Sequence, residues 1–170
     1  MIKRKYLILI AISGFIVALD QLTKMYIHTQ FLLGESVTVV PGFFDLTYIR
    51  NEGAAFGIFR ESQDMFRNIF FLTMPPVAVT FILYILHGIA DDDKVQAVAL
   101  SLVSGGAIGN YIDRLRFRYV IDFLDFHIQR KWTYPAFNIA DSAIVVGIGI
   151  LMLIMFNQWL EERKQKLGTS

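Results

Sequence analysis

Three long stretches of this 170-residue chain contain no Asp, Glu, Lys or Arg: 69–90 (22 residues), 95–112 (18 residues) and 142–160 (19 residues). A bilayer core about 30 Å thick requires about 20 consecutive apolar residues per helix, so each stretch predicts a membrane-spanning helix. With 18% charged residues and a net charge of +1, the chain is unlike a soluble domain, a disordered chain or a nucleic-acid binder. The absence of cysteine excludes a disulfide framework, a thiolate metal site and a cysteine nucleophile.

A fourth apolar stretch, 6–27, follows the basic residues Lys3, Arg4 and Lys5. A basic start before an apolar run also fits a cleaved secretory signal. We favour a retained helix, because no small-x-small cleavage site precedes Asp20 and three further spans would lack a partner. The fold predicted is a mainly α membrane protein forming a single domain over 1–170, with spans at 6–27, 69–90, 95–112 and 142–160, and extracytoplasmic segments at 28–68 and 113–141.

Four spans place both termini on one side of the membrane. The basic clusters at 3–5 and 163–166 predict that this side is the cytoplasm, since the first helix usually dominates orientation. The inside then carries seven Lys and Arg and the outside nine, five of which lie within 114–131. Because lipid phosphates lie at the membrane surface, these five cations are candidates for holding a lipid head group.

The longer outer segment predicts a small folded platform. Residues 37–50 are rich in β-branched and aromatic side chains around the turn signal Pro41-Gly42, which is typical of a β-hairpin. Residues 58–68 mix apolar and charged side chains in a pattern that indicates a short helix lying on the bilayer surface.

Two polar motifs lie on the outer side, and polar residues at the ends of spans are functional candidates by default. Asp20 and Lys24 are spaced i,i+4 and can pair on one helical face. Their alternative interpretation is an interfacial ion pair with a snorkelling lysine. The loop 51–57, Asn-Glu-Gly-Ala-Ala-Phe-Gly, lets the backbone approach a ligand closely, and its alternative is a tight turn after the hairpin.

The outer end of the third span carries a glycine-rich motif followed by polar residues. Gly105 and Gly109 form a small-xxx-small face that favours close helix packing. Asn110 and Asp113 share one face at i,i+3, and simple charge compensation between Asp113 and Arg114 is the alternative to a functional role.

Further acids follow at the same outer level of the membrane. Asp122 has aromatic and aliphatic neighbours, and burial there would raise its pKa. Asp141 begins the fourth span, where capping of the helix N-terminus is the alternative interpretation. Two carboxylates that share a site can act as an aspartic dyad, one as base and the other as acid, without metal or covalent intermediate. Spacing alone does not select two acids out of five.

Two other functions compete with a peptidase. A small proton-coupled transporter would also carry acids within its spans, but usually near the membrane midplane. A metal-dependent phosphotransferase would use Asp122, Asp125 and His127 as Mg²⁺ ligands, and sensitivity to chelators would distinguish it.

Five motifs in register carry a resemblance over nearly the whole chain. They are Asp20-Gln-x-Thr-Lys24, Asn51-x-Gly-Ala-Ala-Phe-Gly57, Gly105-Gly-x-x-Gly-Asn-x-x-Asp-Arg114, Val120-x-Asp-Phe123 and Phe137-Asn-x-Ala-Asp141. In these motifs the chain resembles the bacterial lipoprotein signal peptidases (signal peptidase II), aspartic peptidases of the cytoplasmic membrane.

The resemblance implies that Asp122 and Asp141 are the catalytic pair. It further implies cleavage of a prolipoprotein immediately before a cysteine that already carries diacylglycerol. No metal or cofactor is expected, the chain is expected to be a monomer among membrane lipid, and the cyclic peptide globomycin is the family's inhibitor. The matching substrate-binding or supporting positions are Asp20, Lys24, Asn51, Asn110, Asp113, Arg114 and Asn138.

Overall fold

The computed structural model describes residues 2–53 and 64–168. In these ranges four helices and four strands follow one another in the order α1 (Arg4–Gln30), β1 (Ser36–Val40), β2 (Phe44–Asn51), α2 (Asp64–Gly88), α3 (Lys94–Phe117), β3 (Val120–Ile128), β4 (Trp132–Thr133) and α4 (Ile139–Gly168). Each helix contains a stretch long and apolar enough to cross a membrane. The predicted class, four spanning helices with a small β platform, is therefore confirmed.

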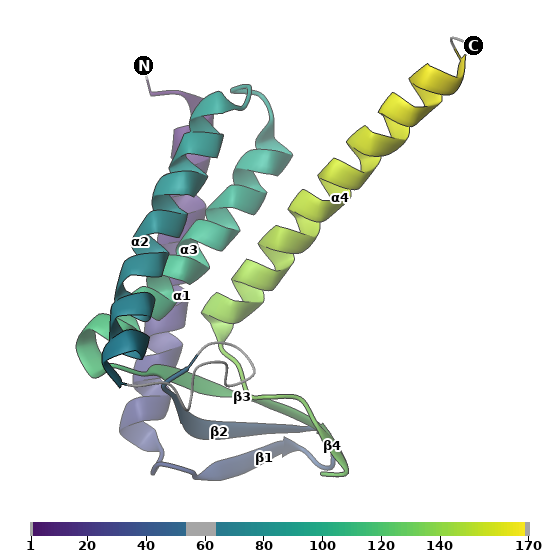
Figure 1. The fold of residues 1–170 in the computed structure, drawn as a ribbon. Helices are drawn as coiled ribbons and strands as arrows, with labels where there is room; N and C mark the ends of the chain where they lie inside the picture. The colour runs from purple at the N-terminus through teal and green to yellow at the C-terminus, as the bar shows by residue number, and fades with distance from the viewer. Residues whose placement is uncertain (1, 54–63, 169–170) are drawn as a thin grey trace.

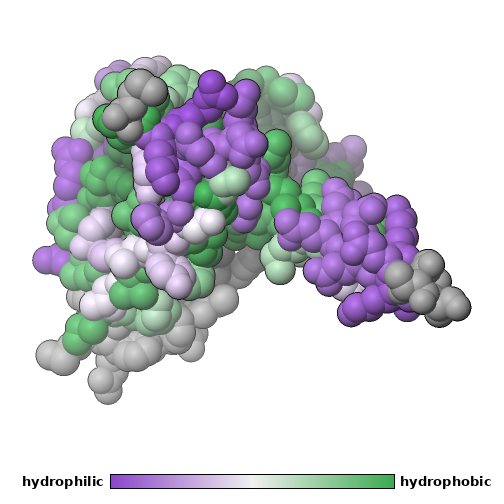
Figure 2. Space-filling model, turned by 90° about the horizontal axis from the view of Figure 1, so that it is seen from above, coloured by the Kyte–Doolittle hydropathy of each residue, from purple (hydrophilic) through white to green (hydrophobic). Residues whose placement is uncertain are grey.

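The helices and the sheet occupy opposite ends of the molecule. Figure 1 shows both chain ends near one end of the helices, while the sheet lies across the other end. Helices α1, α2 and α3 run side by side, and α4 diverges from them toward its C-terminus. Seen from the end that carries the termini, hydrophilic residues form two separate patches with hydrophobic surface between them (Figure 2). Large apolar side chains such as Phe15, Phe81 and Met152 are exposed along the helices, as expected where a helix faces lipid.

The helices continue past the charge-free stretches of the sequence. Helix α3 runs to Phe117, five residues beyond 112, because Asp113 faces the protein interior. It begins at an N-cap, Asp93, whose carboxylate accepts the backbone N–H of Gln96 at 3.0 Å. It ends where Arg118 adopts a left-handed conformation with φ of 68°. Charge-free windows therefore underestimate helices whose terminal polar residues point into the protein.

A buried lysine joins α1 to α2 near the chain's N-terminus. Lys5 is 2% exposed, and its Nζ donates to the carbonyl oxygens of His87 (2.7 Å) and Ile89 (2.8 Å) at the end of α2. A cation at a helix C-terminus satisfies carbonyls that have no partner within the helix. Lys5 is thus a helix cap rather than a freely hydrated basic residue.

Helix α3 packs closely against α1 and α4, and glycines make the approach possible. A Cβ added at Gly105 would lie 3.0 Å from Ser13 Cα of α1, and one at Gly106 would lie 2.3 Å from the carbonyl oxygen of Ala140 of α4. A Cβ at Gly109 would lie 2.6 Å from Asp20 Oδ2. The predicted close-packing face of Gly105 and Gly109 is confirmed, and Gly106 extends it to α4.

The sheet is antiparallel in the order β1-β2-β3-β4. The predicted hairpin is present as β1 and β2, and Gly42 in its turn has φ of 76°. No strand was predicted for 120–128, yet β3 pairs with β2 along most of its length. Six of the nine residues of β3 are buried, including four in a row at 120–123, so the strand lacks the alternation that marks a half-exposed strand.

The predicted surface helix at 58–68 has no counterpart that can be described in full. Residues 58–63 lie outside the described residues, and so do residues 54–57 of the small-residue loop. Residues 64–68 belong to the start of α2 and continue directly into its apolar stretch. This part of the expected surface helix is therefore the first part of a spanning helix.

We predict that Gly106→Ala destabilises the protein while Gly149→Ala does not. The added methyl group would press on the backbone of α4, and overpacking of this kind costs about 1–3 kcal/mol. A Cβ added at Gly149 would meet no atom within 4 Å. Thermal unfolding in detergent should show a lower melting temperature for Gly106→Ala only. Equal melting temperatures would show that α3 and α4 do not depend on this contact.

Candidate active site

Asp122 is held in the middle of the sheet by two amide side chains. It lies on β3 and is 2% exposed. Asn138 Nδ2 donates to Asp122 Oδ1 at 2.7 Å, and Asn51 Nδ2 donates to Asp122 Oδ2 at 2.9 Å. Asn51 ends the neighbouring strand β2, and Asn138 immediately precedes α4. Sheet and helix thus fix this carboxylate from opposite sides.

Asp141 lies in the first turn of α4 and exchanges hydrogen bonds with Asn138. The backbone N–H of Asp141 donates to Asn138 Oδ1 at 2.9 Å, and the backbone N–H of Asn138 donates to Asp141 Oδ2 at 3.3 Å. This reciprocal pattern is a capping box, so the capping contact expected for Asp141 exists. Its other oxygen, Oδ1, accepts a hydrogen bond from Asn110 Nδ2 at 2.7 Å. Capping alone does not explain that second contact.

Asn138 brings the two carboxylates together. Its amide nitrogen binds Asp122, while its amide oxygen and its backbone N–H bind Asp141. A rotation of this one side chain would break contacts to both acids at once. The geometry therefore groups Asp122 and Asp141 into a pair out of the five acids that the sequence offers at this level.

The environment of Asp122 favours its protonated form. Burial, together with the nearby negative charge of Asp141, raises the pKa of Asp122 from 3.8 to about 7, against the opposing effect of the amides of Asn51 and Asn138. Near neutral pH this carboxyl is therefore divided between its two forms. Two acids of which one keeps a proton are the arrangement needed for combined acid and base chemistry.

Four residues, Asp20, Lys24, Asn110 and Asp113, form a buried cluster, here called the Lys24 cluster. It contacts the pair through Asn110, which donates to Asp141. Lys24 is 1% exposed, and its Nζ lies 2.8 Å from Asp20 Oδ2, 2.9 Å from Asp113 Oδ2 and 2.8 Å from Asn110 Oδ1. The ammonium group donates a hydrogen bond to the amide oxygen of Asn110. The amide nitrogen therefore points the other way, toward Asp141. Lys24 does not snorkel, and the interfacial ion pair considered for it is a buried one.

The acids of the Lys24 cluster also fix the two elements that carry the pair. Asp20 Oδ1 accepts the backbone N–H of Ala140 at 2.9 Å, at the start of α4. Asp113 Oδ2 accepts the backbone N–H of Ile121 at 3.2 Å, beside Asp122. Asp113 is therefore more than a counter-charge for Arg114, which was its alternative interpretation.

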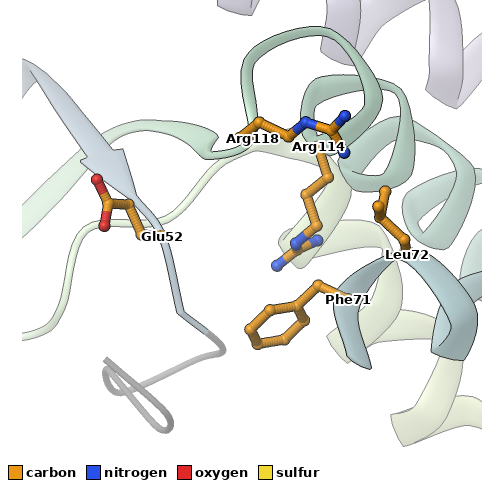
Figure 3. A pocket seen from close by; sticks show the side chains of 5 residues that line it. All are labelled: Glu52, Phe71, Leu72, Arg114 and Arg118. Atoms are coloured by element: carbon orange, nitrogen blue, oxygen red, sulfur yellow. The ribbon is translucent and has the colours of Figure 1, made fainter. Parts of the chain in front are cut away.

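Arg114 reaches from α3 toward the loop after β2. Its guanidinium donates to the carbonyl oxygens of Asn110 and Gly53, each at 3.3 Å, and its Cζ lies 4.6 Å from the centre of the Phe71 ring. Figure 3 shows this side chain above Phe71, with Glu52 on the other side of a small pocket. The guanidinium is close enough to Asp122 and Asp141 to interact with both charges.

Two neighbours of the site were not singled out from the sequence. Gln21 donates from Nε2 to Asp113 Oδ1 at 2.8 Å, and Phe71 packs under Arg114. Gln21 belongs to the Asp20–Lys24 motif, which offered a signal for it. Phe71 lies in an apolar stretch where nothing in the sequence distinguishes it from a lipid-facing side chain.

The residues required for a metal-dependent phosphotransferase are not brought together. Asp122 and Asp125 are three positions apart on a strand and so point to opposite faces. Asp125 pairs across the ladder with Asp45, and His127 hydrogen-bonds Asp45 at 3.1 Å. Within residues 2–53 and 64–168, no group of three His, Cys, Asp or Glu could hold a metal ion.

Comparisons with known proteins agree on one family. Residues 12–157 match the family model described as signal peptidase (SPase) II. A lipoprotein signal peptidase of Syntrophotalea carbinolica is 49% identical over 156 residues, covering 91% of this chain and 92% of that protein. One from Syntrophus aciditrophicus is 42% identical over 164 residues, covering 96% and 99%. A solved bacterial membrane enzyme has a TM-score of 0.79 at 34% identity, covering 88% of this chain and 87% of its own.

We predict that Lys24→Met lowers the stability of the protein by about 3–5 kcal/mol, because it leaves Asp20 and Asp113 buried without a counter-charge. Thermal unfolding in detergent measures the loss. Lys164→Met is the matched control, since Lys164 is 70% exposed in its ion pair with Glu161 and its removal should leave the melting temperature unchanged. Similar melting temperatures for both variants would contradict a supporting role for the Lys24 cluster.

Proposed function

The chain belongs to the signal peptidase II family, the lipoprotein signal peptidases, which remove signal peptides from prolipoproteins, and we propose that Asp122 and Asp141 cut the peptide bond. The observation that carries this assignment is the position of Asn138, which hydrogen-bonds both carboxylates from one side chain. The raised pKa of Asp122 supports it, because the pair then holds one proton near neutral pH.

In the proposed reaction, the ionised Asp141 takes a proton from a water molecule, and the water oxygen attacks the scissile carbonyl carbon. The protonated Asp122 donates a hydrogen bond to the carbonyl oxygen as it gains negative charge. When the C–N bond breaks, the leaving amine takes up a proton from the pair. The products are a free carboxyl end on the signal peptide and a free amine on the lipoprotein, and the pair again holds one proton.

The supporting residues have separate roles in this proposal. Asn110 donates to Asp141 and stabilises its ionised form, while Lys24 keeps that amide in the required orientation. Asn51 and Asn138 keep Asp122 in place on the sheet. Arg114 donates to the backbone carbonyl oxygen of Gly53 and so restrains the chain two residues after Asn51, whose amide holds Asp122.

The proposed substrate is a prolipoprotein that carries diacylglycerol on the cysteine after the cut. Its signal helix and lipid tails lie in the bilayer, so the bond to be cut must reach the enzyme near a membrane surface. The acid pair is suited to that position, since Asp122 lies in the sheet at one end of the four apolar helices. A transporter would need its acids near the midplane instead.

We place the site on the extracytoplasmic face of the bacterial cytoplasmic membrane, with both termini in the cytoplasm. The basic residues near the two termini support this orientation, because Lys and Arg favour the cytoplasmic side. Chain ends and sheet lie at opposite ends of the helices, as the orientation requires (Figure 1). The working form is proposed to be a monomer surrounded by lipid, and a globomycin-type cyclic peptide is proposed as its inhibitor.

We predict that Asp122→Asn and Asp141→Asn each lower kcat for a diacylglyceryl-modified prolipoprotein by about 10²- to 10⁴-fold or more, since each removes one partner of the acid–base pair. Cleavage is measured in detergent micelles with EDTA present throughout. Asp92→Asn, at an exposed position between α2 and α3, is the control and should cut like the wild type. Folded dyad variants that still cut would refute the assignment, and loss of wild-type cleavage in EDTA would indicate a metal.

The pH profile of kcat/KM should be bell-shaped, with its alkaline limb starting near pH 7. Above that pH Asp122 loses the proton that must face the carbonyl oxygen, because its pKa is about 7. Asn51→Ala should move this limb to higher pH, since the Asn51 amide lowers the pKa of Asp122. A limb that moves to lower pH, or does not move, would contradict Asp122 as the proton donor.

A further inference from the structure

A row of stacked aromatic and arginine side chains lies where α1 and α3 meet the sheet. The rings of Phe117 and Tyr119 stack with centres 5.6 Å apart and planes 20° apart. Arg116 Cζ lies 5.1 Å from the centre of the Phe117 ring, and Arg50 Cζ lies 4.7 Å from that of Tyr119. We call these four residues, together with Tyr48, the cation–aromatic ladder.

The ladder is fastened to the protein through Tyr48. Tyr48 is buried, and its hydroxyl lies 2.7 Å from His28 Nδ1 and 3.4 Å from the Tyr119 hydroxyl. Arg50 Nε donates to the same hydroxyl at 3.2 Å. One end of the Arg50 guanidinium is therefore held by the protein, and its plane is fixed by the ring below it.

The two arginines are exposed and carry uncompensated charge. Among the residues that the structure describes, neither Arg50 nor Arg116 is paired with a carboxylate. Burial and the contact with Tyr48 raise the pKa of Tyr119 to about 12, so its hydroxyl supplies no negative charge. The outward N–H groups of both guanidinium ions are thus available to an anion from outside the protein.

The position of the ladder indicates which anion it meets. Phe117 is the last residue of α3. His28 lies near the end of α1, and the centre of its ring is 5.1 Å from that of the Phe117 ring. Tyrosine and arginine are typical of the boundary where spanning helices leave the hydrocarbon layer. The anions concentrated at that depth are lipid phosphates, and the planar N–H fork of arginine matches phosphate geometry.

We propose that the cation–aromatic ladder binds the phosphate of anionic phospholipids in the leaflet that faces the sheet, and that this contact sets the depth of the acid pair. The inference rests on the proposed function only for that second clause. Arg50 directly precedes Asn51, whose amide holds Asp122. In the sheet, Arg50 of β2 also pairs with Ile121 of β3. A lipid bound at Arg50 would therefore restrain both strands next to the catalytic carboxylate.

The first test measures lipid binding without any substrate. The purified protein is exposed to an equal mixture of phosphatidylglycerol and phosphatidylcholine, and the lipids that it retains are counted by native mass spectrometry. Arg50→Gln/Arg116→Gln should lower the preference for phosphatidylglycerol at least about fivefold. The control Lys94→Gln/Arg163→Gln removes the same amount of charge from exposed positions outside the ladder and should change the preference little.

Three results would overturn the proposal. The preference could be the same in the ladder variant and the wild type, or it could fall equally in the ladder variant and the control. It could also disappear when inorganic phosphate replaces chloride at equal ionic strength, which would identify a site for free phosphate rather than for lipid. Arg50→Lys/Arg116→Lys covers a folding failure of the glutamine variant, and it should retain part of the preference because charge remains without the planar fork.

The second test concerns the depth of the acid pair. In nanodiscs, kcat/KM of the wild type should be at least about threefold higher with phosphatidylglycerol than with phosphatidylcholine, and the ladder variant should lose this difference. If the ladder variant kept the full difference, lipid binding at the ladder would not set the depth of the acid pair, although the binding itself would stand. Asp122→Asn should bind phosphatidylglycerol like the wild type, so failure of the ladder proposal and failure of the catalytic assignment give different results.

Discussion

The buried ammonium group of Lys24 organises the polar interior of this protein. It contacts Asp20, Asp113 and Asn110 within 2.9 Å, deep between apolar helices. Each carboxylate oxygen of the two acids accepts a hydrogen bond or an ion pair, because Ala140, Ile121 and Gln21 supply the remaining N–H groups. Through these contacts one cation is linked to the first turn of α4, to the start of β3 and to the Asn110 amide, whose orientation it fixes.

Such a cluster is an expensive way to hold helices together. Charged groups lose their hydration when they are buried, and their mutual attraction offsets this loss only with good geometry and complete hydrogen bonding. Apolar side chains of similar size often stabilise the folded state as well or better. The glycines of α3 already allow close packing with α1 and α4. The cluster is therefore better explained by the orientation of the Asn110 amide than by a gain in folding stability. It fixes that amide in one orientation, in which the amide nitrogen donates to Asp141.

Much of the architecture follows from local rules in the sequence. Three charge-free stretches and the apolar stretch 6–27 locate the four spans, and the turn at Pro41-Gly42 locates the hairpin. The sequence alone predicts only that Asp113, Asp122 and Asp141 lie at one outer level, and the choice of Asp122 and Asp141 as a pair comes from the family resemblance. Contacts such as Asn138 to Asp122, or Arg50 to Tyr119, join segments that lie far apart in the chain or on different elements. Strand β3 was missed because burial on both faces removes its alternation.

Helix α4 leaves the other three helices as it runs toward the C-terminus, and large apolar side chains such as Val145, Met152 and Met155 are exposed along it. Its first turn carries Asp141, whereas Asp122 belongs to the sheet. A helix surrounded by lipid tilts to match the thickness of the hydrocarbon layer. Because Asp141 lies in the first turn of α4, we expect bilayer thickness to act on its distance from Asp122, so that the proposed reaction runs at different rates in thin and thick membranes.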